Sequence, residues 1–504
     1  MFDPKKDEYA ESWVEAVPPK GIIDAETKVV FKQLAEENGV NQRKLQIKMD
    51  FFILSPIILL YLLAYLDRLN ISNANIYGLS EDLNMTASQY NIALAVFFVP
   101  YVVFELPGNY FLKLFSPHVV LSSLMVIFGC VSLAQGFVQN YHGLIVCRVL
   151  LGFAEAPMLP ACYYLLGSWY TRAEAQKRYS FFFSSTSLAG AFGGLIAYGM
   201  NTIDMQRGLE GWRWLFIVEG SITAFCGLLL FFLIVDFPET AGFLKPNERE
   251  YMRAKLAIDQ GDSNFEHKPT LKEMLAVFKD PKITLAAVMY FGLIITIYGY
   301  AYFSIAIINT FGYSEVQTQV HSIYPWVTSF GMNLIVATFS DLTRHRYLYT
   351  LSCSLLSIVG LAILLGTSPT ADFREVRYAA CFMIVVGVYC AGPILVCWTT
   401  MNVVGHTRKM VFSAFTISFG NIGGIISTFS YKGQEAPGYI TGLWVSLATV
   451  LLSIITSAAY LVLVYRENRE KKTKLGEYQQ QWSDFTLQDR SEKGEANPNF
   501  WYMY

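Results

Sequence analysis

The stretch FFILSPIILLYLLAYLDRLNISNAN, residues 51–75, decides the fold. It opens with sixteen largely apolar residues, and a helix needs roughly 20 such residues to cross the hydrocarbon core of a bilayer. Asp67 and Arg68 follow. The helix is then expected to continue through a stretch rich in Asn and Ser that is too polar to face lipid. An ionisable side chain in a spanning helix costs about 2.5–3.5 kcal/mol, so it marks a functional hypothesis. The stretch therefore predicts a membrane helix whose last part lines water or protein.

The composition of the whole chain indicates a membrane protein. Of the 504 residues, 53% are hydrophobic and 15% are charged, and the mean hydropathy is +0.35, whereas a soluble domain carries roughly 25% charged residues. Apolar stretches of spanning length, about twelve in all, alternate with short polar turns. They lie near 51–75, 89–113, 119–138, 142–168, 179–201, 212–235, 283–309, 321–341, 348–366, 377–401, 411–431 and 440–465. We predict an all-α membrane protein with twelve transmembrane helices.

The hydrophilic stretch 236–282 divides these helices into two halves of six. We expect an N-terminal tail over 1–50, a first half over 51–235, a linker over 236–282, a second half over 283–465 and a C-terminal tail over 466–504. Basic residues concentrate in the turns after the second, fourth, eighth and tenth stretches, and in the linker and tails. By the positive-inside bias, these segments and both termini are expected in the cytoplasm. Two six-helix halves are the general plan of a secondary transporter.

Several other classes of protein are excluded. The net charge of -2 offers no basic excess for binding nucleic acid. The eight cysteines are scattered singly, without CxxC pairs or histidines at ligand spacing, so we expect no metal and no cofactor. A phosphate-binding loop, an HExxH motif and a GxSxG motif are absent from the sequence, which argues against an ATP-driven pump and against an enzyme.

Four charges in predicted helices form the candidate site. Asp67 and Arg68 belong to the first helix, and Arg148 and Glu155 belong to the fourth. Arg148 and Glu155 are seven residues apart, so they lie on nearly the same helix face. Because the first and fourth helices run in opposite directions, we expect all four side chains to form one neutral cluster. A static salt-bridge cluster that only joins helices is the structural alternative.

Charge balance gives the cluster a function. An organic anion that enters a neutral cluster leaves one negative charge, which a proton on a carboxylate cancels, so an anion-and-proton symporter is the simplest interpretation. We expect Glu155, near the middle of the membrane, to carry the proton, with Asp67 as the second candidate. Arg68 is the candidate clamp for the anion, because a guanidinium offers a planar bidentate fork to a carboxylate. Arg148 is expected to hold the acids.

Four polar or aromatic residues of the second half are further candidates for contact with the substrate. Tyr298 and Tyr302 share a helix face, and Asn402 and Asn421 lie within or at the end of apolar stretches. The tyrosines are suited to stacking on a flat substrate and the asparagines to hydrogen bonding with it. Helix packing and contact between helices are equally consistent with the two asparagines, and packing is the more common role for an aromatic stripe.

Several motifs resemble a known family. YLDRLNISNANIYGLSEDLNMTASQYN, RVLLGFAEAPMLPACYYLLGSWYTRAEAQKR, GWRWLFIVEG, PETAGFLKPNERE and the terminal NPNFWYMY are similar to the anion:cation symporter family of the major facilitator superfamily, in its fungal allantoate permease branch. The run of the chain looks most like the nicotinate permeases of that branch.

The resemblance implies proton symport of a small organic anion. Nicotinate or a similar monocarboxylate is the first choice, and allantoate, ureidosuccinate, pantothenate and biotin are the alternatives. It places Asp67, Arg68, Arg148 and Glu155 at the acid and arginine positions of the family and Asn421 at a substrate-contacting position. It also implies the plasma membrane, with an internal membrane such as the endoplasmic reticulum as the alternative. We expect the protein to be a monomer. A nutrient sensor that does not transport is a further alternative.

One motif departs from the family pattern. The loop between the second and third helices, PGNYFLKLFSPH, keeps only Lys113 of the superfamily's usual charged motif, whereas the second half retains SDLTRHR. We therefore expect the cytoplasmic gate to depend on Asp341 and Arg344.

Overall fold

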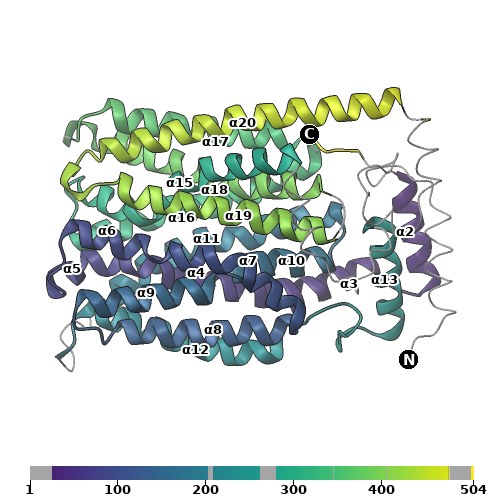
Figure 1. The fold of residues 1–504 in the computed structure, drawn as a ribbon, viewed down its shortest axis with the longest axis horizontal. Coiled ribbons are helices and arrows are strands. Elements are labelled where there is room, and N and C mark those ends of the chain that lie inside the picture. The colour runs from purple at the N-terminus through teal and green to yellow at the C-terminus, as the bar shows by residue number, and fades with distance from the viewer. Residues whose placement is uncertain are drawn as a thin grey trace.

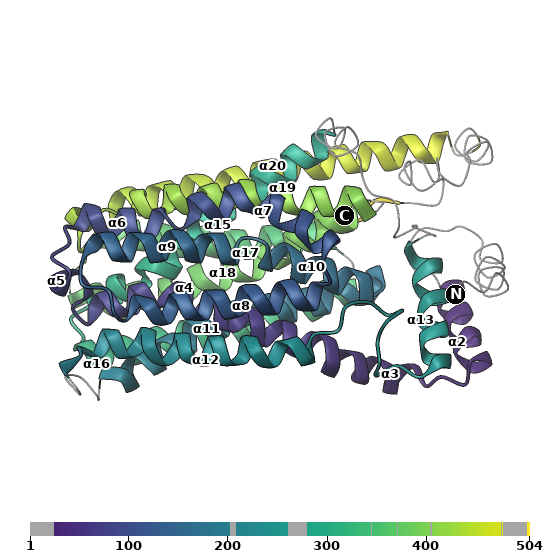
Figure 2. The same cartoon turned by 60° about the horizontal axis from the view of Figure 1, so that its bottom comes forward.

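The computed structural model describes residues 25–201, 208–260, 280–343, 345–369, 371–403, 406–474, 476 and 501–504, and these ranges contain helices and no strand (Figures 1 and 2). Among the described residues, 11 helical segments are long and apolar enough to cross a membrane. A further helix of 29 residues, α16 (Glu315–Thr343), completes the set at the position of the eighth predicted stretch. The predicted all-α membrane fold is confirmed.

The long helices form two halves that lie side by side, with the purple-to-teal half below the green-to-yellow half in Figure 1. The first half contains α4 (Ser55–Ile76), α6 (Ala87–Ala95), α7 (Phe98–Leu114), α8 (Pro117–Gln135), α9 (Tyr141–Glu155), α10 (Met158–Trp169), α11 (Arg172–Asn201) and α12 (Gly211–Leu233). The second half contains α15 (Pro281–Asn309), α16, α17 (Arg346–Gly366), α18 (Arg374–Met401), α19 (His406–Ser430) and α20 (Ile440–Thr473). Short helical turns α5 (Leu79–Asp82), η3 (Ala371–Phe373) and η4 (Gly433–Glu435) lie between them.

Two of the predicted helices are interrupted, and the interruptions meet. The second breaks between α6 and α7, and the fourth breaks between α9 and α10 at Pro157, where proline supplies no backbone N–H. A Cβ on Gly152 would lie 2.1 Å from the carbonyl oxygen of Phe97. Only glycine permits this approach of the two backbones. The contact places Arg148 and Glu155 beside the break in the second helix.

Outside the long helices, the N-terminal segment and the linker pack against one end of the first half, to the right in Figure 1. We call this the terminal end of the bundle. The segment contains α2 (Ala25–Glu37), α3 (Gln42–Met49) and the π-helix η1 (Asp50–Leu54), which runs directly into α4, and the linker contains α13 (Pro246–Gln260).

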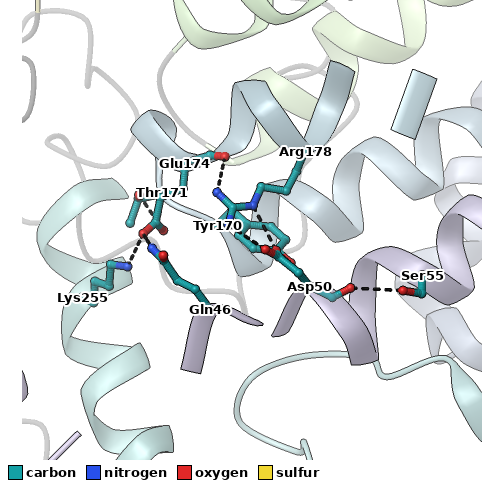
Figure 3. A network of polar contacts seen from close by, with 8 residues as sticks. All are labelled: Gln46, Asp50, Ser55, Tyr170, Thr171, Glu174, Arg178 and Lys255. Carbon is teal, nitrogen blue, oxygen red and sulfur yellow. Dashed lines mark hydrogen bonds and ion pairs between the residues drawn. The ribbon is translucent and has the colours of Figure 1, made fainter. Parts of the chain in front are cut away.

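A polar network ties these segments to the start of α11 (Figure 3). Lys255 of α13 is 2.7 Å from Glu174, which also accepts hydrogen bonds from Gln46 and from Thr171. Arg178 and Asp50 form a bidentate ion pair at 2.9 and 3.0 Å. Burial acts to raise the pKa of Glu174, but Lys255 and these hydrogen bonds outweigh it and lower the pKa below its usual value.

Candidate functional site

The centre of the site is an ion pair between the first and fourth helices. Arg68 of α4 and Glu155, the last residue of α9, are 1% and 0% exposed. The Nε of Arg68 donates to Oε2 of Glu155 at 3.3 Å, and its Nη2 donates to Oε1. The geometry is the bidentate fork that arginine forms with a carboxylate. It neutralises both charges away from water.

This ion pair continues into a chain of hydrogen bonds that crosses between the halves. Nη1 of Arg68 donates to the hydroxyl of Tyr298 at 2.6 Å, and that hydroxyl donates to Oδ1 of Asn421 at 2.9 Å. Nδ2 of Asn421 donates to Glu105 of α7 at 3.4 Å. The chain therefore runs from the first half to α15 and α19 of the second half and back. Tyr298 and Asn421 lie in the centre, where we expected contact with the substrate.

Arg148 has a different environment. Its Nε donates to the backbone oxygen of Ala93 at 3.3 Å. Its Nη1 and Nη2 are buried and face the hydroxyl of Tyr302, and no other polar group among the described residues hydrogen bonds to these three atoms. A buried donor without a partner costs about 1–3 kcal/mol, and more when it is charged. These three donors, on α9 and α15, are suited to binding a ligand whose oxygens accept hydrogen bonds.

Aromatic rings surround these donors. The guanidinium carbon of Arg148 is 5.3 Å from the ring centre of Phe97, and the rings of Tyr298 and Tyr302 stack at 6.0 Å with 15° between their planes. Phe98 meets Tyr298 edge to face at 4.7 Å. The guanidinium carbon of Arg68 also lies 5.0 Å from the ring centre of Phe97. Flat aromatic faces beside guanidinium groups are suited to an aromatic or otherwise planar anion.

The structure corrects the prediction of one cluster of four charges. Asp67 does not join the arginines: its Oδ1 accepts from Ser132 of α8 at 3.0 Å and from Asn70 at 3.5 Å. The reason is geometric, because adjacent residues on a helix point about 100° apart, so Arg68 faces α9 while Asp67 faces α8. The expected role of Arg148 also differs, since Glu155 pairs with Arg68 instead.

Asn402 is placed at the terminal end, where the last residues of the chain occupy its amide. Its Nδ2 donates to the backbone oxygen of Met503 at 3.0 Å, and its Oδ1 accepts from the backbone nitrogen of Met503 at 2.7 Å. Asn468 of α20 makes the same pair of bonds with the backbone of Tyr502, at 3.0 Å each. Both polar groups of the Asn402 amide are therefore occupied by the chain terminus, and its contact with substrate stays a prediction.

Asp341, one of the two expected gate residues, pairs with a different arginine. It accepts from Nη2 of Arg346 at 2.7 Å, and the backbone nitrogen of Arg346 donates to the backbone oxygen of Tyr504 at 2.7 Å. Arg344 lies outside the described residues. The contact of Asp341 is thus within the second half, at the start of α17.

Two buried acids were missed from the sequence. Glu105 lies in the centre beside Asn421, and Glu219 of α12 accepts a hydrogen bond from Asn70. They are 0% and 2% exposed. Each is the only acid of an apolar stretch, FFVPYVVFELPG or WLFIVEGSITAF, so the rule that singled out Asp67 identifies both.

Comparison with known proteins decides the family. The model of the Major Facilitator Superfamily matches residues 57–428, which is more than half of the chain. The chain belongs to the major facilitator superfamily. Members of this family are transporters and not enzymes, in agreement with the sequence prediction, and the chain is accordingly an integral membrane protein.

Two curated major facilitator relatives cover nearly the whole chain. The high-affinity nicotinic acid transporter of Saccharomyces cerevisiae is 31% identical over 461 residues, which are 91% of this chain and 84% of that protein. The major facilitator-type transporter hxnP of Emericella nidulans is 31% identical over 471 residues, which are 92% of this chain and 93% of that protein.

A solved major facilitator structure shares the fold. It is a bacterial homologue of the human lysosomal transporter Spinster in an inward-facing, unoccupied conformation. The TM-score is 0.58 at 14% identity, over 81% of this chain and 95% of that one.

Proposed function

We propose that this major facilitator protein is a proton-coupled symporter of a small organic anion, with Arg148 as the anchor of the anion. One observation carries the proposal: the two terminal nitrogens of Arg148 and the Tyr302 hydroxyl are buried and face one another, and no carboxylate or backbone oxygen among the described residues accepts a hydrogen bond from them. All three are donors, and a carboxylate brings two acceptor oxygens and the opposite charge. Because the donors come from both halves, a bound anion contacts both parts that move in alternating access.

The proposed substrate is a nicotinate-like monocarboxylate. The stacked rings of Tyr298 and Tyr302 and the nearby Phe97 and Phe98 suit a flat ring attached to the carboxylate. The relative named as a nicotinic acid transporter supports the same choice. The other carboxylates of the allantoate permease branch, namely allantoate, ureidosuccinate, pantothenate and biotin, are the alternatives.

Proton coupling is proposed from the charges. Arg68 is neutralised by Glu155, whereas Arg148 has no carboxylate among its described contacts. An anion that neutralises Arg148 therefore changes the net charge of a region with low dielectric, and a proton on a buried acid restores the balance. Glu155 and Asp67 are the proposed proton-coupling acids, as the sequence predicted.

The experiment is transport into proteoliposomes that contain the purified protein. We expect labelled nicotinate to accumulate without ATP when an inward proton gradient is imposed, and to be displaced by excess unlabelled carboxylates that share the site. In Glu155→Gln, Arg68 loses its counter-charge and an anion binds without a proton. Gradient-driven accumulation should then fall to the level of equilibration while counterflow exchange persists. Wild-type accumulation in this variant would refute the coupling scheme.

We further propose a monomer in the plasma membrane with both termini in the cytoplasm. The basic turns after the second, fourth, eighth and tenth helices support this orientation. The gate is proposed at Asp341, which pairs with Arg346 at the terminal end. Protease protection of the two chain ends in sealed right-side-out vesicles tests the orientation directly.

A further inference from the structure

Two carboxyl groups of the first half share one amide nitrogen. Asn70 lies on α4 one turn after Asp67, and its Nδ2 donates to Oδ1 of Asp67 at 3.5 Å. The same nitrogen donates to Oε2 of Glu219 on α12. Ser132 of α8 adds a second hydrogen bond to Asp67 at 3.0 Å. Asp67, Asn70 and Glu219 form one group, which we call the α4–α12 acid pair.

The acid pair is buried with part of its polar surface unused. Oδ2 of Asp67, Oε1 of Glu219 and Oδ1 of Asn70 have no hydrogen-bond partner among the described residues. The hydroxyl of Thr223, one turn after Glu219 on α12 and 0% exposed, faces Asp67, and no other polar group among the described residues hydrogen bonds to it. The ion pairs seen in the described ranges bring no Lys, Arg or His to either acid, because Arg68 is held by Glu155.

Two ionised carboxylates in this position would be very costly. Burial of a single charge in a membrane helix costs about 2.5–3.5 kcal/mol, and two like charges that share a hydrogen-bond donor add their repulsion. Neighbouring carboxyl groups relieve such repulsion when one of them holds a proton. A second proton can bind to one of the unused carboxyl oxygens. The Thr223 hydroxyl is already placed to hydrogen bond to the carboxyl group of Asp67.

The packing of α12 against α8 does not require these acids. Next to Glu219, α12 crosses α8 at Gly220, where a Cβ would lie 2.3 Å from the backbone nitrogen of Leu133. Gly129 of α8 makes the reciprocal approach to Ala224 at 2.3 Å. Small residues of this kind join membrane helices without any charge. The cost of the acid pair therefore needs another explanation.

We propose that Asp67 and Glu219 form a proton-binding pair that holds one proton in the empty carrier and takes up a second when the anion binds. The inference rests on the proposed function and adds Glu219 as the partner of Asp67. With one proton the pair carries a single negative charge, which balances the positive charge of Arg148. An anion neutralises Arg148, and the second proton then neutralises the pair. One proton accompanies one monocarboxylate.

The contacts favour a proton over a metal cation. Asn70 presents its amide nitrogen, a donor, to both carboxyl groups. A sodium ion between the carboxylates would need the oxygen of Asn70 in that place, because a cation is coordinated by acceptors. The groups that face the pair are Ser132 from α8, Thr223 from α12 and, by its charge, Glu155 from α9.

The pH dependence of gradient-driven uptake tests the pair. Glu219→Gln removes the carboxyl group that shares the first proton with Asp67. Because that sharing stabilises the singly charged pair and makes the second proton harder to add, the midpoint of uptake should move to the alkaline side by about one pH unit. Asp67→Asn should leave coupled uptake that depends on Glu219. In the double variant Asp67→Asn with Glu219→Gln, the pair is permanently neutral. Accumulation should then fall to equilibration while counterflow exchange persists.

The matched control is Glu210→Gln, at the residue that precedes α12, where a 37% exposed carboxylate pairs with Arg213. Glu210→Gln should keep the wild-type pH profile. Glu219→Asp, which keeps a carboxyl group at that position, should also show the wild-type profile, unlike Glu219→Gln. Counterflow in each variant reports a folded carrier. A profile for Glu219→Gln that superimposes on the wild type, or uptake driven by a sodium gradient in place of a proton gradient, would overturn the proposal.

A measurement without substrate separates this inference from the proposed function. Infrared difference spectra of the purified protein between acidic and neutral pH detect the C=O stretch of protonated carboxyl groups. We expect a band that weakens in Glu219→Gln and weakens further in the double variant. Its persistence in the double variant would refute the pair even if transport is confirmed. Its loss would support the pair even if nicotinate and the other carboxylates are not transported.

Discussion

Replacing Arg148 with lysine tests the anion anchor most directly. The change keeps the positive charge but replaces a fork of two terminal nitrogens, Nη1 and Nη2, with a single ammonium group. A bidentate carboxylate then loses one charge-assisted hydrogen bond, which contributes about 1.5–3 kcal/mol. At about 1.4 kcal/mol for each factor of ten, the apparent affinity should fall roughly 10- to 100-fold. The maximal rate should change much less, because the charge that balances the proton remains.

The assay is the concentration dependence of labelled nicotinate uptake in proteoliposomes under a fixed proton gradient. The matched control is Arg377→Lys on α18, because Arg377 is also buried, at 2% exposure, but donates to the backbone oxygens of Leu364 and Thr367. That variant should keep the wild-type KM. If Arg148→Lys also keeps the wild-type KM within about twofold, a bidentate contact, worth at least a factor of ten by the estimate above, is not made.

Three further changes test the fold around the site. Gly152→Ala places a methyl group 2.1 Å from the Phe97 oxygen, so we expect a loss of about 1–3 kcal/mol from overpacking, measured as a lower thermal midpoint in detergent. Asn402→Ala removes the two bonds that hold the last residues of the chain, so carboxypeptidase should trim that end faster. Glu174→Gln weakens the contact with Lys255 and should expose α13 to proteolysis. Because the pKa of Glu174 is lowered, acid should produce the same exposure only below the pH at which an ordinary glutamate loses its charge.

Each of these changes has a control in the same structure. Gly199→Ala adds a methyl group with nothing within 4 Å and should leave the thermal midpoint unchanged. Asn309→Ala, at the end of α15 that lies away from the terminal end of the bundle, should leave trimming of the C-terminus unchanged. Glu375→Gln, a 76% exposed carboxylate, should leave α13 protected. An unchanged thermal midpoint, trimming rate or cleavage rate in the matching test variant would contradict the contact concerned.

The hydrophobic pattern was sufficient to predict the twelve helices, because each must bury about 20 residues in lipid whatever its neighbours are. It was not sufficient to predict where a helix is interrupted. The break after α6 depends on the close approach between Gly152 and Phe97, which joins residues far apart in the chain. At the break after α9, the sequence offers Pro157 and, three residues later, Pro160.

Four charges of the candidate site were found from the sequence, but Glu105 and Glu219 were missed, and only part of the pairing was predicted. Arg68 and Glu155 were expected to meet and do so, whereas Asp67 faces α8 and α12. A hydropathy pattern gives the face of a helix relative to lipid, but it does not say which of several neighbouring helices an inward face contacts. The partner of Asp67, Glu219, lies 152 residues away on a helix whose position depends on packing of the entire half.

The terminal segments show how the two halves are able to move. Residues 502–504 hydrogen bond to α17, α18 and α20 of the second half and reach Lys282 of α15. The segments α3 and α13 contact α11 of the first half. Each terminal segment therefore stabilises its own half at the terminal end. None of these contacts joins one half to the other. The chain from Glu155 through Arg68 and Tyr298 to Asn421 does bridge them. Rigid-body rocking of the halves must break or remake that central chain, so the energy of the Arg68 contacts should enter the same step that exposes Arg148 to the proposed anion.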